Sequence, residues 1–172
     1  MKLTSVQELI SRYLILLLVA IPNLYLFYLI FTPLTVYPVY IFFSLILETT
    51  LLDNIIIINN IAIELIKSCI AGSAYYLLLI LNLAIPNIKL AKRIKMISFA
   101  FATFLIFNII RIIILSWMAL NTSDFFAITH KLTWYFLSVI LVVGIWFSEV
   151  KIFKIKEIPF FTDIKFLYKF IK

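Results

Sequence analysis

Three residues in this apolar chain have side chains suited to nucleophilic chemistry: Cys69, Arg111 and His130. They include the only cysteine and the only histidine of the sequence. A thiolate is a nucleophile, and an imidazole can accept and return a proton near neutral pH. A guanidinium stays charged and donates hydrogen bonds to an oxyanion or a substrate carboxylate. If the three residues converge, the sequence predicts one catalytic site.

The composition indicates what kind of molecule holds them. The 172 residues are 65% hydrophobic with a mean hydropathy of +1.17, so we expect a polytopic membrane protein with one membrane domain. In such a protein the net charge of +7 reflects topology and attraction to anionic lipid, and we expect no nucleic-acid partner. One cysteine excludes an internal disulfide, and with one histidine it leaves a zinc site dependent on carboxylates. We therefore expect no metal and no other cofactor.

The predicted fold class is an all-α polytopic membrane protein over residues 1–172. The expected spans are 13–31, 69–86, 96–118 and 131–149, and the first is an uncleaved helix that Pro22 can kink. Segment 33–52 leaves two alternatives open. As an interfacial or re-entrant helix it gives four spans with the N-terminus inside; as a span it gives five with the N-terminus outside.

The segment before Cys69 carries two runs of β-branched residues around Asn59 and Asn60. Asparagine tolerates the positive φ angles of tight turns, so we expect a short hairpin on the outer side. An irregular loop is the alternative.

Charge sets the expected orientation. The basic loop 89–95 and the tail 151–172 are predicted to be cytoplasmic, and the tail to lie on the inner membrane surface. The loop 119–130 has no lysine or arginine and is predicted to face outward. We therefore expect a multi-pass protein of the cell membrane with its site near the extracytoplasmic face.

Helical rise then brings the three residues to one depth. Cys69 lies about 17 residues, roughly 25 Å, from the cytoplasmic end of its helix. Arg111 lies about 15 residues, roughly 22 Å, from the same side, and His130 precedes the last span. An arginine within an apolar span costs on the order of 2.5–3.5 kcal/mol, which favours a functional role. The competing interpretations are an inert packed thiol, a solvated histidine and an arginine paired with Asp124 or Glu64.

The order of these residues resembles the archaeosortase/exosortase family. The likeness covers about residues 50–147: Ile63-Glu64-Leu65-Ile66-Lys67-Ser68-Cys69 before an apolar helix, the basic loop, Asn108-Ile109-Ile110-Arg111-Ile112, and His130 before the last span. The family usually has Gly two residues after Cys, whereas this chain has Ala71 and then Gly72. The short length is that of a core-only member, and the richness in Ile, Lys and Asn favours an archaeal one.

The resemblance implies a membrane cysteine peptidase or transpeptidase. Its substrates would be surface proteins that end in a short motif, a transmembrane helix and a basic cluster, with an acceptor such as a membrane lipid. Cys69 would form a thioester, His130 would protonate the leaving amine, and Arg111 would stabilise the oxyanion. Asn108 lies one turn before Arg111 and would support it. The alternatives are a non-enzymatic membrane assembly subunit and a membrane thiol acyltransferase.

Overall fold

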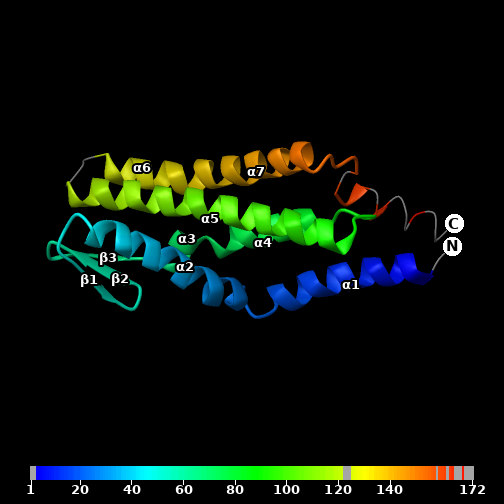
Figure 1. The fold of residues 1–172 in the computed structure, drawn as a ribbon, viewed down its shortest axis with the longest axis horizontal. Coiled ribbons are helices and arrows are strands. Elements are labelled where there is room, and N and C mark those ends of the chain that lie inside the picture. Colours follow the sequence, from blue (N-terminus) through cyan, green and yellow to red (C-terminus); the bar gives the residue numbers. More distant parts are fainter. Residues whose placement is uncertain (1–2, 122–124, 158, 162, 165–167, 169–172) are drawn as a thin grey trace.

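A computed structural model describes residues 3–121, 125–157, 159–161, 163–164 and 168. It is mostly helical, with a small β-sheet at one end (Figure 1). The elements are α1 (Leu3–Ala20), α2 (Tyr25–Ser44), β1 (Thr49–Leu52), β2 (Ile55–Ile58), β3 (Ile61–Glu64), α3 (Lys67–Ile70), α4 (Gly72–Leu83), α5 (Leu90–Leu120), α6 (Phe126–Leu132), the π-helical turn η1 (Thr133–Leu137) and α7 (Ser138–Ile152).

Two helices, α2 and α5, are long and apolar enough to cross a membrane. Large apolar side chains also cover much of the outer surface, such as Leu29, Ile106 and Phe147. An apolar exterior of this kind suits a lipid environment. The number of spans, four or five, stays a prediction.

The N-terminal part differs from the expected pattern. The predicted span 13–31 is divided after Ala20, because Asn23 and Leu24 adopt left-handed φ angles of 50° and 60° beside Pro22. Segment 33–52 is also divided, since its first part continues α2 through Pro33 and Pro38. Five of the six buried residues of α2 recur at every fourth position and form one packed stripe, which Val36 adjoins: Phe27, Phe31, Thr35, Val39 and Phe43. We attribute the persistence of the helix through both prolines to this packing.

The predicted span 69–86 is likewise interrupted near its start. Ala71 has a φ of 59° and separates the single turn of α3 from α4. The next residue, Gly72, packs under an aromatic ring, and a Cβ atom there would lie 2.8 Å from the Tyr28 ring. Cys69 therefore belongs to a short turn of its own, ahead of the longer helix.

The predicted hairpin is confirmed. Strands β2 and β3 pair antiparallel around Asn59 and Asn60, whose φ angles are 47° and 67°. The sequence reasoning missed β1, which pairs with β2 and makes a three-stranded sheet in the order β1-β2-β3. The protein is therefore not purely α-helical.

Helix α5 is the centre of the bundle and packs against α2, α4 and α7. The sheet and α6 lie at one end of the long axis, and the loop between α4 and α5 lies at the other, near the start of α1 (Figure 1). A cluster of aromatic rings joins α2, α4 and α5, with the ring centroids of Phe31 and Tyr75 3.6 Å apart.

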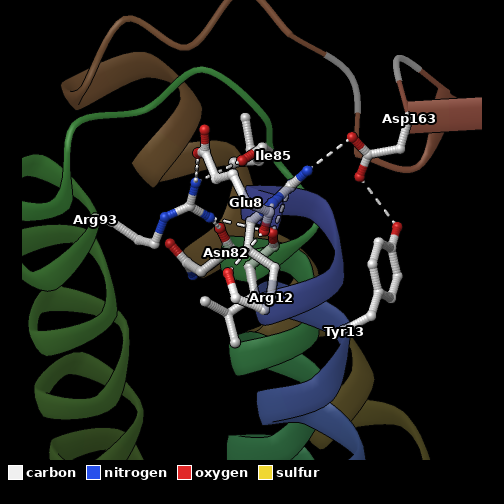
Figure 2. Close-up of polar contacts among 9 residues, drawn as sticks. Glu8, Arg12, Tyr13, Asn82, Ile85, Arg93 and Asp163 are labelled. Carbon is white, nitrogen blue, oxygen red and sulfur yellow. Dashed lines mark hydrogen bonds and ion pairs between the residues drawn. The ribbon is translucent and has the colours of Figure 1, made fainter. Parts of the chain in front are cut away.

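The end opposite the sheet is closed by a network of ionic side chains, which we name the terminal cluster: Glu8, Arg12, Tyr13, Arg93 and Asp163 (Figure 2). Arg12 pairs with Asp163 at 2.8 Å, and Asp163 also accepts a hydrogen bond from the Tyr13 hydroxyl at 3.1 Å. Part of the predicted membrane-surface tail therefore packs back on α1. Much of the remaining tail lies outside the described residues.

The two arginines of this cluster also bind the carbonyl groups at the end of α4 (Figure 2). Arg93 donates to the carbonyls of Asn82, Leu83 and Ile85, and Arg12 donates to that of Leu83. These carbonyls lie at the helix end that lacks intrahelical donors, so the two guanidiniums cap α4. The cluster thus fixes the position of the helix that follows Cys69.

Candidate functional site

The three sequence-predicted residues border one cavity of about 110 Å³ near the sheet end of the bundle. Cys69 comes from α3, Arg111 from α5 and His130 from α6. The cavity is also lined by Glu64 and by hydroxyl side chains, namely Ser68, Ser116 and Thr133. The structure therefore brings together the residues that the sequence placed at one depth. The cavity has room for a small polar group such as a peptide carbonyl.

The backbone carbonyl of Cys69 is held by two side chains of α5. Asn108 Nδ2 donates to it at 2.9 Å, and Arg111 Nη2 donates to it at 3.2 Å. Asn108 and Arg111 lie one turn apart, so they reach the same oxygen from one helix face. Their contact with the turn that carries the thiol explains how Asn108 supports the site. Asn108 holds the Cys69 backbone through this hydrogen bond.

The Arg111 side chain is buried, with only 7% of the residue exposed. Its Nη1 donates to Ser138 Oγ at 3.1 Å. Its Nε has no hydrogen-bond partner among the described residues. A buried guanidinium N–H without a partner is costly, and such groups are rare. Arg111 therefore lines the cavity with one donor unused by the protein.

Ser138 and Thr133 are contacts that the sequence reasoning missed. Ser138 Oγ donates to the Thr133 carbonyl at 3.4 Å, and Thr133 Oγ1 donates to the His130 carbonyl at 3.0 Å. This series of hydrogen bonds links Arg111 to the helix that carries His130. The π-helical turn Thr133–Leu137 separates the two hydroxyls, and π turns often occur at functional sites. The only sequence signal was a pair of hydroxyl residues within an apolar run.

The structure gives the Cys69 thiol a nearby cation but little stabilisation from a helix dipole. Cys69 is half-buried and is the third residue of a four-residue helix, so α3 offers only a short dipole. The nearby cation remains, because Arg111 is bonded to the Cys69 backbone. Arg111 makes no ion pair with Glu64 or any other described acid. The other predicted partner, Asp124, lies outside the described residues.

His130 is half-buried and contributes its side chain to the cavity wall. Its neighbour Lys131 is exposed. Among the described residues, no group of three or more His, Cys, Asp and Glu side chains could hold a metal ion. The donors that meet at this cavity are a thiol, a guanidinium, an imidazole and hydroxyls, which suit acyl chemistry.

No protein-family model matches this sequence, and no similar protein is found among the curated proteins or the solved structures.

Proposed function

We propose that this protein is a membrane cysteine transpeptidase or protease that cleaves sorting signals near the C-termini of surface proteins. The observation that carries the proposal is the buried Arg111, whose Nε has no partner in the described part of the chain and which lines the cavity shared with Cys69 and His130. A guanidinium held in this way is preorganised to receive negative charge. The thiol and the imidazole supply the other two groups that acyl transfer requires.

The proposed reaction has two steps. The Cys69 thiolate attacks a peptide carbonyl, and Arg111 stabilises the oxyanion that forms. The C–N bond then breaks, His130 gives a proton to the leaving amine, and a thioester remains on Sγ. In the second step a lipid hydroxyl or amine, or water, attacks the thioester carbonyl and loses its proton to His130. The C–S bond breaks and the thiolate is restored.

The proposed topology places this site at the extracytoplasmic face of a multi-pass protein. The support is the separation of charge along the bundle. The basic segment 89–95, which forms the start of α5, and the terminal cluster lie at one end, whereas the sheet and α6 lie at the other (Figure 1). A substrate with an outer motif, a transmembrane helix and an inner basic cluster would present its motif at the level of Cys69.

The test is co-expression with surface proteins from the same genome that end in such a signal. We expect cleavage of the substrate by the wild type, and loss of cleavage with Cys69→Ala and His130→Gln. Ser148→Ala and Lys131→Gln are the matched controls, because Ser148 is exposed and bonds only its own helix, and Lys131 is exposed beside His130. Cleavage that persists with Cys69→Ala in a membrane-inserted protein would exclude this function.

Mass spectrometry of the adduct on Cys69 separates the chemical alternatives. The proposal predicts a peptidyl thioester, which should accumulate in the Cys69-containing enzyme when the acceptor is withheld. A fatty-acyl thioester would indicate a thiol acyltransferase instead. A genome that encodes no protein with a motif, helix and basic cluster at its C-terminus would favour a non-enzymatic assembly subunit.

A further inference from the structure

The sheet ends in a strand whose outer side is open. β3 is the last strand in the order β1-β2-β3, and its residues are mostly exposed. It carries no proline or lysine, the residues that often protect an edge strand from pairing. An edge of this kind can accept another extended chain.

The hydrogen-bond register shows which backbone groups face the open side. The Leu65 N–H donates to the Asn54 carbonyl at 2.9 Å, one step beyond the pair of Ile55 and Glu64. In an antiparallel ladder, hydrogen-bonded and non-hydrogen-bonded pairs alternate. Ala62 and Glu64 therefore direct their N–H and C=O groups away from β2. We find no protein partner for these groups within the described part of the chain.

This open edge runs directly into the cavity of Cys69. Ile63, Glu64 and Leu65 line that cavity together with Cys69 and Arg111. Four residues separate Glu64 from Cys69, and the chain turns at Leu65 and Ile66 into α3. A peptide that paired with β3 would therefore reach the thiol in an extended conformation.

We infer that the substrate peptide binds by adding a fourth strand to the open edge of β3, with its backbone bonded to Ala62 and Glu64. This inference rests on the proposed function. Strand addition draws affinity from main-chain hydrogen bonds, so it suits an enzyme that reads only a short motif. In the proposed topology β3 runs from the outside toward the membrane, as does the substrate before its transmembrane helix. The added strand is thus parallel, and the residues N-terminal to the scissile bond form it.

The first test needs no substitution. The probe is acetyl-tetra-alanyl chloromethyl ketone, used on the full-length protein in detergent micelles with detection of the Cys69 adduct. The thiolate forms a C–S bond to the probe and releases chloride. Probes N-methylated at successive alanines are compared, because neighbouring N–H groups of a strand point to opposite sides. We expect methylation at alternate positions to slow labelling by about five- to tenfold, the loss of one or two hydrogen bonds, and the positions between them to have little effect.

The second test uses Ala62→Pro with Ala62→Val as its matched control. Proline removes the N–H of Ala62, one of the two N–H groups of β3 that point to the open edge, and leaves the bonds to β2 intact. We expect Ala62→Pro to slow labelling by the peptidyl probe by about five- to tenfold, and Ala62→Val to leave it near the wild-type rate. Iodoacetamide should label both variants as fast as the wild type, which shows that the thiol itself is unaltered.

Two outcomes would overturn strand addition. One is equal slowing by N-methyl groups at every position; the other is a tetra-alanyl probe no faster than acetyl-alanyl chloromethyl ketone. Both could occur while substrate cleavage still required Cys69, so the proposed function would stand. If cleavage is independent of Cys69, the proposed function fails, whatever the probes show.

A dimer formed through β3 would be a separate contradiction of an edge open to peptide. It would be seen as a loss of probe labelling that depends on protein concentration.

Discussion

Arginine side chains hold the backbone at both ends of the segment formed by α3 and α4, but with different completeness. At the end of α4, Arg12 and Arg93 bind the carbonyls of three residues, 82, 83 and 85, and Arg12 also has an ionic partner in Asp163 (Figure 2). At α3, Arg111 binds the Cys69 carbonyl and Ser138, and the residues that the structure describes offer no partner to its Nε. The arginine contacts at the end of α4 are made within the protein and support the fold. The arrangement at α3 retains the capacity to bind something else.

The comparison distinguishes Arg12 and Arg93, which have a structural role, from Arg111, for which we propose a functional one. Both kinds are buried and both bind carbonyl oxygens. What distinguishes Arg111 is an unused donor, an adjoining cavity and a thiol on the same wall. Substitutions at the two ends should therefore change different measured quantities.

The largest effect on stability should come from Arg12→Ala. The change leaves Asp163 buried without its cation and removes a donor to the Leu83 carbonyl. Loss of one partner of a buried pair costs about 3–5 kcal/mol, so we expect that decrease in the free energy of unfolding. Unfolding in mixed micelles by SDS titration measures it. The double variant with Asp163→Ala should recover part of the loss, and a decrease below about 1 kcal/mol would contradict a closed cluster.

The largest effect on activity should come from Arg111→Ala. Removal of an oxyanion donor lowers turnover by about 10²–10³-fold, and we expect that loss in substrate cleavage. The same SDS titration should show little change in stability, because Arg111 is buried with one donor unpaired. Arg111→Lys should also be impaired, since lysine lacks the planar fork that reaches Ser138 and the Cys69 carbonyl together. Normal cleavage by Arg111→Ala would contradict a catalytic role for Arg111 and leave it a structural residue like Arg12.

Asp163→Asn and Tyr13→Phe separate the contribution of a charge from that of a single hydroxyl in the terminal cluster. Asn keeps the shape of Asp163 but removes the charge that Arg12 contacts, so we expect a decrease of about 1.5–3 kcal/mol in unfolding free energy. Phe removes only the hydroxyl that donates to Asp163, and we expect about 1 kcal/mol. Both variants should cleave substrate normally once folded. If the two variants lose the same free energy of unfolding, the charge of Asp163 contributes no more than a neutral hydrogen bond.

The smallest effect should come from Asn108→Ala. It removes one of the two hydrogen bonds to the Cys69 carbonyl and leaves the bond from Arg111. A neutral hydrogen bond is worth about 0.5–1.5 kcal/mol, so cleavage should fall by a few-fold to about tenfold. Asn121→Ala is the control, because its side chain bonds only the Trp117 carbonyl within its own helix and is exposed. A loss as large as that of Arg111→Ala would assign Asn108 a direct role in the reaction.

Part of this arrangement could be predicted from sequence because it depends on local chemistry. Asparagines tolerate positive φ, so the turn at Asn59 and Asn60 was predictable. The meeting of Cys69 and Arg111 at one cavity was expected from the constant rise of a helix and from the positions of charged segments. The residue types also limited the chemistry of the site, because the chain offers one thiol and one imidazole.

Other features depended on packing between segments far apart in the chain. The break at Ala71 accompanies the close contact of Gly72 with Tyr28, and α2 passes through two prolines while its aromatic stripe packs on α4 and α5. The contact of Ser138 with Arg111 needs a π turn that has no local signature. Sequence alone determined which groups could react. Tertiary packing decided which hydrogen-bond donors already have partners within the protein. Those partners come from segments that are far apart in the sequence and meet only in the folded chain.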